Sequence, residues 1–564
     1  MLQAPILRWI KTYHKEAFLR DLVAAMIVTM LLIPQSLAYA MLAGLPPEVG
    51  LYASILPLVF YAFFGSSTTL SVGPVAVISL MTATSLGAVA EQGGVTYLTG
   101  AITLALMSGT MYVLLGVFRF GFVANFLSHT VISGFITASG IIIALGQVKH
   151  LLGVDASGGT LLELLPPLFS HLEQTNLHTL VLGVSVLCFL FLTRTYLAGW
   201  LMALGAEGRT AELIAKTSPV IAVVGSILVA KIFVLEDSGV ALTGAVPSGF
   251  PAFHFTLPDI ALIEALFLPA LMITLIGYIE SISVGKTLGA KRQEKVDPDQ
   301  ELVGLGMANI ASGVSGGFPV TGGFSRSVVN FDAGAVTQVA SILAGLGILM
   351  ACLFLTPILF YLPKATLAAT IIVAVSSLID FGMLKRTWAY SKSDFYAVCG
   401  TIIITLTLGV EIGVASGIFL SISLHLYRTS KPHIAEVGLV AGTEHFRNVE
   451  RFKVETSSRV LTLRQDESLF FANAAQLEDR ILNEVYRRDS IAHVIIQFSA
   501  VNEVDFSALE MLESLNSKLL AQGICLHFSE VKGPVMDKLK QTGLFEDLSG
   551  NVYLSQYEAF QSLK

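Results

Sequence analysis

Residues 318–330 interrupt the hydrophobic second half of the chain and carry the residue types needed to hold an anion. They read Phe-Pro-Val-Thr-Gly-Gly-Phe-Ser-Arg-Ser-Val-Val-Asn. Residues 319–321 favour an extended segment, the two glycines favour a flexible joint, and Ser325 is a good N-cap residue for a helix. The first turn of that helix would combine unpaired N–H groups, the positive end of the helix dipole and the guanidinium of Arg326, all of which attract an anion. Because polar backbone at membrane depth is tolerated only where it lines a cavity, this stretch predicts half of a binding site.

A second stretch with the same pattern lies at residues 69–79, Thr-Leu-Ser-Val-Gly-Pro-Val-Ala-Val-Ile-Ser. It predicts a short strand followed by a helix, with Pro74 in the first helical turn. The two stretches are seven predicted membrane spans apart, so the second copy is inverted and two half-helix N-termini could face each other at mid-membrane. The alternative is two unrelated helices, each kinked by its proline.

Side chains from the first predicted span and the arginine complete a candidate anion site. Gln35 and Tyr39 lie four residues apart, hence on one helix face, where Gln35 could donate a hydrogen bond to an oxyanion and Tyr39 could close the pocket. Such a pair also serves as an ordinary contact between membrane helices. An arginine inside a membrane segment faces a cavity or a partner, and the alternatives for Arg326 are the membrane interface or a pair with Asp332. The backbone donors expected at this site belong to Val75, Ala76, Phe324 and Ser325.

Glu280 lies among apolar residues of the eighth predicted span. A carboxyl group there is a candidate proton relay or cation site, because an apolar environment favours its neutral, protonated form. Protonation would remove its repulsion of an incoming anion and thereby couple proton entry to anion entry. The alternative is a structural ion pair with Arg326 or Lys286.

The composition places these residues in a membrane protein. Of the 564 residues, 54% are hydrophobic and 13% are charged, and the mean hydropathy is +0.73, outside the range of soluble globular proteins. Apolar segments of about spanning length recur through the first three quarters of the chain, and we count fourteen, two of them short or broken. They lie near 21–44, 50–65, 73–91, 96–117, 121–147, 177–194, 217–235, 260–285, 302–317, 324–333, 335–358, 364–380, 393–408 and 410–427.

Loop charges indicate an even number of spans with both termini cytoplasmic. Basic residues follow the spans expected to end inside, from Arg119 to Arg428, whereas loops 148–176 and 236–259 are mainly acidic. The positive-inside rule then predicts a multi-pass protein of the cytoplasmic membrane. Residues 1–20 are expected to be a cytoplasmic segment, and because no small-residue cleavage site follows, the first span is interpreted as a membrane helix and not as a signal peptide.

The composition changes after Pro432, where short strands and helices begin to alternate. We predict strands at 459–463, 468–472, 492–498 and 524–528, and helices at 474–486, 507–520 and 534–541. This pattern is typical of a small cytoplasmic α/β domain. The expected domains are a transport domain over 21–430, with repeats at about 21–235 and 260–430, a linker at 431–440 and the α/β domain at 441–564.

Other functional classes find little support. No nucleophile–base or metal-ligand arrangement is evident, so we expect neither an enzyme nor a bound metal or cofactor. The four cysteines are scattered, which argues against a disulfide framework. The net charge of −7 argues against nucleic acid as a partner.

Several motifs in order resemble the sulfate permease (SulP) family of anion transporters. They are Ile-Pro-Gln-Ser-Leu-Ala-Tyr-Ala at 33–40, Leu-Pro-Pro-Glu-Val-Gly-Leu-Tyr at 45–52, Ser-Val-Gly-Pro at 71–74, Glu-Ser-Ile-Ser at 280–283 and Phe-Ser-Arg-Ser at 324–327. The tail resembles the sulfate transporter and anti-sigma-factor antagonist (STAS) domain, with Asp-Phe-Ser-Ala-Leu at 505–509. Phe506 stands where such domains place a phosphorylatable residue, which argues against phosphorylation at this turn and favours a docking or dimer-stabilising role.

The resemblance implies a helical membrane protein with a seven-plus-seven inverted repeat, divided into a core and a gate domain. It implies an anion held between the third and tenth half-helices and contacted by the first span, an elevator movement of the core, and a homodimer in the lipid bilayer. On this basis we expect proton-coupled uptake of sulfate or a similar oxyanion. The alternatives are sodium-coupled bicarbonate transport, with a sodium role near Glu280, a C4-dicarboxylate carrier and, from another class, a membrane-anchored STAS signalling protein.

Overall fold

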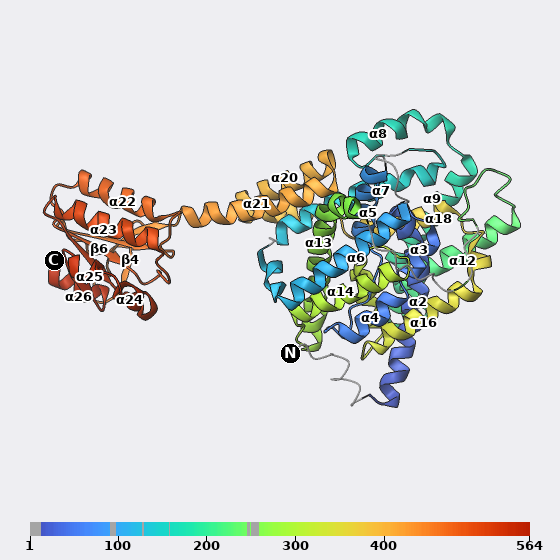
Figure 1. The fold of residues 1–564 in the computed structure, drawn as a ribbon, viewed down its shortest axis with the longest axis horizontal. Coiled ribbons are helices and arrows are strands. Elements are labelled where there is room, and N and C mark those ends of the chain that lie inside the picture. Colours follow the sequence, from blue (N-terminus) through green and yellow to red (C-terminus); the bar gives the residue numbers. More distant parts are fainter. Residues whose placement is uncertain (1–12, 91–96, 127–128, 157, 245–248, 250–258) are drawn as a thin grey trace. The chain divides into compact units, whose positions relative to one another are not determined.

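The computed structural model describes residues 13–90, 97–126, 129–156, 158–244, 249 and 259–564 (Figure 1). The chain divides into two compact units, Met1–Ser421 and Ile422–Lys564. The first is helical and contains one two-stranded ladder, and the second is built on a six-stranded sheet. Helix α21 (Val410–Ser430) continues from the first unit into the second.

The helices of the first unit pack in two groups. In one group, α14 (Pro298–Val314) lies against α6 (Tyr97–Val117) and α4 (Leu56–Phe64), and α16 (Val339–Phe354) lies against α2 (Lys15–Leu42) and α4. In the other, α18 (Lys364–Ser376) and α20 (Lys392–Leu408) both lie against α7 (His129–Leu152), and α9 (Leu177–Leu192) lies against α18 and α12 (Ser218–Ile232). We call the first the core group: α2 (Lys15–Leu42), α3 (Pro47–Tyr52), α4 (Leu56–Phe64), α5 (Ala76–Ala90), α6 (Tyr97–Val117), α13 (Ile260–Arg292), α14 (Pro298–Val314), α15 (Phe324–Asp332) and α16 (Val339–Phe354).

The gate group contains α7 (His129–Leu152), α8 (Leu161–Ser170), α9 (Leu177–Leu192), α10 (Ala198–Ala203), α11 (Gly208–Lys216), α12 (Ser218–Ile232), α18 (Lys364–Ser376), α19 (Gly382–Tyr390), α20 (Lys392–Leu408) and α21. The short helices η2 (Phe120–Phe126), η3 (Leu172–Gln174), η4 (Thr193–Leu197) and α17 (Thr356–Leu359) connect them. Helix α21 belongs here because Gly413 and Gly417 face Thr405 of α20 and Val131 of α7.

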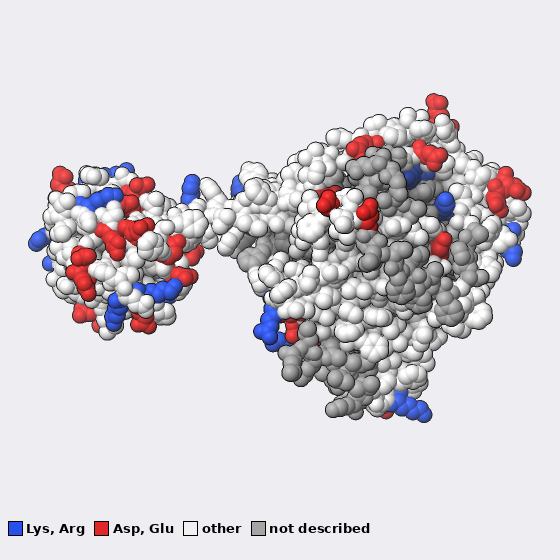
Figure 2. Space-filling model, in the orientation of Figure 1, with Lys and Arg blue, Asp and Glu red and all other residues white. Residues whose placement is uncertain are grey.

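Each of the fourteen predicted spans overlaps one of these helices. By length and composition, seven helices within the described ranges can cross a membrane, or eight if the bent pair Thr210–Lys216 and Ser218–Ile232 counts as one span. Several other helices are shorter, including α5 and α15, which we expected to be half-helices. The outer surface suits lipid: large apolar side chains such as Phe118, Phe354 and Phe419 are exposed, and Figure 2 shows few charged side chains on the visible face of the larger unit.

Small residues let the core helices approach closely. A Cβ atom added at Gly109 of α6 would lie 2.9 Å from the carbonyl oxygen of Gly306 of α14, and one added at Gly306 would lie 2.8 Å from the carbonyl oxygen of Gly109. Backbone contact of this kind is the usual way in which membrane helices pack tightly without a hydrophobic driving force between them.

Buried carboxylates fix the turns between core helices. Glu301 of α14 is fully buried and accepts hydrogen bonds from the Tyr61 hydroxyl (2.7 Å), the Ser66 hydroxyl (2.7 Å) and the N–H groups of Ser66 (2.8 Å) and Ser67 (2.9 Å). These bonds hold the turn that follows α4. Since a buried charge is stable only when its hydrogen-bonding capacity is met, the four donors explain why this acid is tolerated inside the unit.

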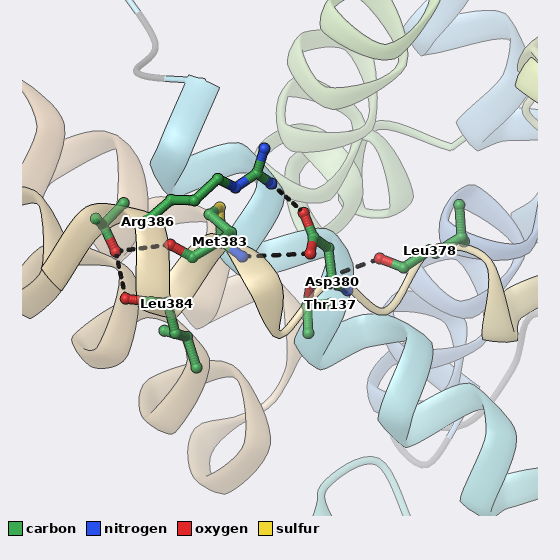
Figure 3. Close-up of polar contacts among 7 residues, drawn as sticks. Thr137, Leu378, Asp380, Met383, Leu384 and Arg386 are labelled. Atoms are coloured by element: carbon green, nitrogen blue, oxygen red, sulfur yellow. Dashed lines mark hydrogen bonds and ion pairs between the residues drawn. The ribbon is translucent and has the colours of Figure 1, made fainter. Parts of the chain in front are cut away.

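The gate group has its own polar turn, shown in Figure 3. Asp380 follows α18; its N–H donates to the Thr137 hydroxyl of α7 (3.2 Å), and its carboxylate accepts from the Met383 N–H (3.2 Å) and from Arg386 (2.7 Å). All four residues belong to the gate group or to the turn within it, so this contact stabilises the group internally.

The second unit is an α/β domain with strand order β4-β3-β5-β6-β7-β8. The strands are β3 (Ile434–Leu439), β4 (Phe446–Asn448), β5 (Val460–Gln465), β6 (His493–Gln497), β7 (Cys525–Ser529) and β8 (Val552–Tyr553). Neighbours from β5 to β8 are parallel, and β3 is antiparallel to β4 and β5. Helices α22 (Ala474–Arg487), α23 (Phe506–Leu520), α24 (Gly533–Leu539) and α25 (Leu544–Asp547) share one hydrophobic core with the sheet, and α26 (Gln556–Leu563) belongs to another that includes β3.

Most of the elements predicted for this domain are present, and one is wrong. Residues 468–472 form no strand; Leu469 makes a single isolated bridge to Val504. The reason is that side chains take the backbone donors there: the Phe471 N–H donates to the Asp505 carboxylate (2.8 Å) and the Phe470 N–H to the Asn473 amide oxygen (3.1 Å). Residues 431–440, which we expected to be a linker, contain β3 of the sheet.

We predict that Glu301→Ala lowers the apparent melting temperature of the detergent-solubilised protein. The substitution leaves four donors without an acceptor, and hydrogen bonds to a charged group contribute about 1.5–3 kcal/mol each. Glu236→Ala removes an exposed carboxylate and is the matched control, with a melting temperature near that of the parent. Equal melting temperatures for Glu301→Ala and the parent would contradict the role given to this carboxylate.

Candidate functional site

The two polar stretches meet in an antiparallel ladder at the centre of the core group. Strand β1 (Val72–Gly73) pairs with β2 (Thr321–Gly322), so the first of the two glycines that we expected to form a flexible joint is part of a strand. Because paired antiparallel strands run in opposite directions, α5 and α15 leave the ladder at opposite ends. The N-termini of both helices therefore flank one ladder, as expected for an inverted pair.

Buried hydroxyl groups lock this ladder. The Ser327 hydroxyl of α15 accepts from the Ser71 N–H (2.9 Å) and donates to the Gly323 carbonyl (2.7 Å), which joins the two stretches directly. The Ser281 hydroxyl of α13 accepts from the Gly322 N–H (2.8 Å). The Ser71 and Gly322 N–H groups thus have acceptors inside a membrane protein, where an unpaired N–H group is costly.

Two further side chains hold the approach to β2. The Asn309 amide of α14 both donates to the Val320 carbonyl (2.8 Å) and accepts from the Val320 N–H (2.9 Å), as a neighbouring strand would. The Thr321 hydroxyl donates to the Gly277 carbonyl of α13 (2.7 Å). Ser281, Asn309 and Thr321 were not among the predicted site residues; the signal for them was a polar residue inside or beside an apolar span.

Arg326 spans the ladder from one half to the other. Its side chain is buried, one terminal nitrogen donates to the Pro74 carbonyl (2.7 Å), and the other lies 3.4 Å from the Thr321 carbonyl. Two glycines make the room: a Cβ atom added at Gly73 or Gly323 would lie 3.1 Å or 2.7 Å from a guanidinium nitrogen. The Arg326 Nε atom is buried and has no hydrogen-bond partner. A buried guanidinium with an unused donor is suited to an anionic ligand.

The alternatives considered for Arg326 do not match the structure. It is not at an interface, because 2% of it is exposed. Asp332, the acid proposed as its partner, forms an ion pair with Lys216 of α11. Within the described part of the chain, no carboxylate forms an ion pair with Arg326.

Both predicted helix starts are wrong by one or two residues. Helix α15 begins at Phe324 with Gly323 as its N-cap, so Ser325 lies inside the first turn and does not cap it. The Gly323 N–H donates to the Ser71 carbonyl (3.1 Å), which extends the strand-like backbone up to the helix. Pro74 lies before α5 and not in its first turn, because its carbonyl is engaged by the arginine.

The four predicted backbone donors lie at these two helix starts. Val75 and Ala76 are buried where α5 begins, and Phe324 and Ser325 are exposed at the start of α15. No described group accepts a hydrogen bond from the N–H of any of the four. Unpaired N–H groups at two helix N-termini add positive potential to that of the guanidinium.

Gln35 and Tyr39 lie on α2, which packs against both α5 and α15. Tyr39 is buried and lies within electrostatic range of Arg326 and Glu280, and Gln35 is partly exposed. Neither side chain has a hydrogen-bond partner among the described residues, so the contact with another helix that we considered as an alternative is not a polar one. Their polar atoms remain available to a ligand.

Glu280 lies on α13, one residue before the serine that holds β2. It is partly exposed and within electrostatic range of Arg326, Tyr39 and Tyr112. Over the described ranges it forms no ion pair with Arg326 or Lys286, the two structural partners considered for it. The structure places the eight predicted site residues on four helices of the core group or, for Val75, immediately before one of them, and it brings Tyr39, Glu280 and Arg326 within electrostatic range of one another. The eight are Gln35, Tyr39, Val75, Ala76, Glu280, Phe324, Ser325 and Arg326.

One cluster of side chains in the second unit consists of residue types that commonly bind metal ions. Potential ligand atoms of His493, Cys525 and His527 lie within 4.8 Å of one another. Burial lowers the pKa of His527 to about 4, so the ring is neutral near pH 7. Its Nδ1 accepts from the Asn551 N–H (3.0 Å), which leaves the proton on Nε2, 3.1 Å from His493 Nδ1. His527 thus donates to His493 and has no free lone pair for a metal.

Comparison with known proteins adds the identity of the family. Residues 18–401 match the sulfate permease family and residues 451–559 match the STAS domain. The chain belongs to the sulfate permease family. Among its relatives, sulfate transporter 4.1, chloroplastic, of Arabidopsis thaliana is 34% identical over 556 residues, covering 96% of this chain and 79% of that protein. High affinity sulfate transporter 2 of Stylosanthes hamata is 31% identical, covering 96% of this chain and 83% of that protein.

Solved structures share the fold of this sulfate permease. The overall structure of SLC26A9 has a TM-score of 0.90 at 23% identity and covers 99% of this chain and 92% of that chain. Murine Slc26a9 in the inward-facing state has a TM-score of 0.88 at 24% identity, covering 99% and 94%. The transmembrane domain of the cyanobacterium bicarbonate transporter BicA has a TM-score of 0.62 at 20% identity, covering 72% and 98%. The expected fold class is confirmed: the protein is a multi-pass helical membrane anion transporter with a STAS domain, and not an enzyme.

We predict that Gly323→Ala weakens anion binding without unfolding the protein. The new methyl group would meet the guanidinium at 2.7 Å and displace it, whereas Gly73→Ala, at 3.1 Å, should have a smaller effect. The measurement is the rise in melting temperature with increasing anion concentration, which reports ligand binding to the folded state. Identical anion-dependent shifts in the parent and Gly323→Ala would show that the position of Arg326 does not matter for binding.

Proposed function

We propose that this sulfate permease is a secondary active transporter that couples the uptake of sulfate, or a similar oxyanion, to protons by an alternating-access movement. The observation that carries the proposal is the position of Arg326. Its buried guanidinium lies between two helix N-termini, its Nε atom has no hydrogen-bond partner, and no carboxylate pairs with it in the described structure. The relatives at 31–34% identity, which are named sulfate transporters, favour sulfate as the anion.

The proposed binding site uses charge and directional donors together. Arg326 would supply the formal positive charge, and the free N–H groups of Val75, Ala76, Phe324 and Ser325 would supply hydrogen bonds. Gln35 and Tyr39 would add side-chain donors from α2. An oxyanion accepts several such hydrogen bonds at once, and bonds to a charged acceptor are about twice as strong as neutral ones.

Glu280 is the proposed coupling residue. An ionised carboxylate within electrostatic range of the site opposes a second negative charge, whereas a protonated carboxyl group does not. A proton bound to Glu280 would thus favour anion binding, and anion binding would favour the proton to the same extent, because such linkage is reciprocal. The absence of an ion pair to Arg326 or Lys286 among the described residues leaves the carboxyl group free to titrate.

The proposed movement shifts the core group relative to the gate group. All eight proposed site residues lie on α2, α5, α13 and α15 or immediately before α5, so a rigid shift of the core would carry the intact site. The same site could also serve sodium-coupled bicarbonate transport or C4-dicarboxylate transport, because helix N-termini and a guanidinium attract any small anion. A membrane-anchored STAS signalling role is the alternative from another class.

The remaining parts of the proposal concern the setting of the protein. From the basic residues in the predicted inner loops, we place both termini on the cytoplasmic side of the plasma membrane. We propose a homodimer and a docking or dimer-stabilising role for the STAS domain. In that domain Asp505 caps α23 by accepting from the Ala508 N–H (2.8 Å), and Phe506, where relatives place a phosphorylatable residue, is exposed.

The direct test is uptake of labelled sulfate, bicarbonate and succinate into proteoliposomes, each under an imposed proton or sodium gradient. Accumulation of sulfate with an inward proton gradient supports the proposal. Accumulation of bicarbonate with sodium and no response to protons would keep the site but replace both substrate and coupling ion. Failure to move any of the three anions would reject the choice of substrates.

We predict that Glu280→Gln abolishes proton-driven accumulation of sulfate and retains exchange of internal for external sulfate. The amide resembles the protonated carboxyl group, so the anion site stays intact while the coupling proton has no place to bind. Glu264→Gln changes an exposed carboxylate on the same helix and is the matched control. Normal proton-driven accumulation in Glu280→Gln would remove Glu280 from the coupling mechanism.

A further inference from the structure

Each half-helix is tied, beyond its second turn, to a helix of the gate group. On α5, the Ser85 hydroxyl lies 2.6 Å from the carboxylate of Glu411 of α21, and the Thr84 hydroxyl lies 3.5 Å from it. On α15, Asp332 forms an ion pair with Lys216 of α11. These contacts lie outside the proposed anion site.

The two ties occupy equivalent places in the inverted repeat. Ser85 is nine residues after the first residue of α5, and Asp332 is eight residues after that of α15. With 3.6 residues per turn, both lie between two and three turns from the site, and the helices leave the ladder at opposite ends. The gate partners also correspond, because α11 leads into the seventh predicted span and α21 is the fourteenth. One tie therefore serves each half of the repeat.

We propose that these contacts are polar ties that hold the core half-helices against the gate group in this conformation, and that Glu411 and Lys216 are positioning residues for the conformational step of transport. The inference rests on the proposed alternating movement. A shift of the core relative to the gate changes the distance between the partners of both ties at once, because each tie has one partner in each group.

The two ties differ in how far they can stretch. Ser85 is buried and its hydroxyl is one bond from the Cβ atom, so a shift of about 1 Å breaks a hydrogen bond that weakens steeply beyond about 3.2 Å. Lys216 has a long flexible stem, and about a third of each partner's side chain is exposed, so this pair follows a small movement and is screened by water. The Ser85–Glu411 tie therefore controls the conformational equilibrium more strongly.

The Ser85 hydroxyl lies within hydrogen-bond distance of two acceptors, so variants of both Ser85 and Glu411 are needed to test the contact between them. The hydroxyl lies 2.7 Å from the Met81 carbonyl within its own helix as well as 2.6 Å from Glu411. Ser85→Ala removes the tie from the core side, and Glu411→Gln keeps the length and the acceptor oxygen but removes the charge. If both act on one tie, the double variant has no greater effect than the larger of the two single variants.

The experiment reads the conformation and not the transport rate. A reporter cysteine replaces the exposed Ser325 at the start of α15, in a background in which Cys188, Cys352, Cys399 and Cys525 are serine. A charged, membrane-impermeant thiol reagent is applied to either side of sealed vesicles that hold the full-length protein. The ratio of the two modification rates reports which side the site faces.

We expect Ser85→Ala to change this ratio about tenfold toward the other side, the size expected for losing one charge-assisted hydrogen bond. Glu411→Gln, which keeps a neutral acceptor, should change the ratio in the same direction by less. The double variant should match Ser85→Ala, and Asp332→Asn should also change the ratio by less. Asp380→Asn removes a similar carboxylate contact that lies wholly within the gate group (Figure 3) and should leave the ratio unchanged.

Three results would contradict the proposed role of the ties. They are an unchanged ratio in Ser85→Ala and Glu411→Gln, a change in Asp380→Asn equal to that in Ser85→Ala, or additive effects in the double variant. The proposed function fails in a different way. If sulfate does not slow modification of the Ser325→Cys reporter, the proposed anion site is wrong. The ratio of the modification rates from the two sides still tests the two ties in that case.

Discussion

The hydrogen bond from Arg326 to the carbonyl of Pro74 joins two stretches that lie some 250 residues apart in sequence. Burying a guanidinium in an apolar environment is costly, so the groups around it are constrained from several directions. Gly73 and Gly323 leave space for it. The ladder between β1 and β2 sets the distance that it spans, and the hydroxyls of Ser281 and Ser327 keep the ladder in register.

Buried polar groups elsewhere in the core group support the contact between Arg326 and Pro74. Glu301 fixes the turn before β1. Asp21 plays a similar part after α15, where it accepts from the Thr337 N–H (3.1 Å) and hydroxyl (2.6 Å). Inside a membrane, such hydrogen bonds fix the position of the backbone as well as stabilising it, because a buried donor or acceptor without a partner costs several kcal/mol. The polar atoms left without protein partners, among them Arg326 Nε, then stand out as candidates for ligand contact.

Periodicity and composition predicted the elements well and their ends less well. Long apolar runs located the spans, because about 20 apolar residues are needed to cross a bilayer. The helix starts at Phe324 and Ala76 were misplaced because side chains distant in sequence decide them: the Ser71 carbonyl holds Gly323 extended, and the arginine engages Pro74. Residues 468–472 look like a strand, yet Asp505 and Asn473 capture their backbone donors. Local pattern carries no information about such partners.

Two of the candidate site residues could be proposed from the sequence on physical grounds. Arg326 and Glu280 are charged residues in apolar surroundings, and membranes tolerate these only with a function or a partner. Ser281 and Asn309 attract less notice because a lone hydroxyl or amide is inexpensive, although they hold the backbone on which the site depends. The shared pattern of the two stretches, seven predicted spans apart, already indicated which half-helices pair, and the family motifs implied the same pairing.

The common location of Arg326 and Glu280 on the core has an electrical consequence under the proposed movement. Both charges would travel with the site, so the empty core with an ionised Glu280 would carry no net charge from this pair through the membrane field. The core loaded with a divalent oxyanion and one proton would carry one net negative charge, and with a monovalent anion and one proton it would carry none. Since moving one elementary charge through 100 mV involves about 2.3 kcal/mol, the membrane potential would act on the loaded form according to the valence of its cargo.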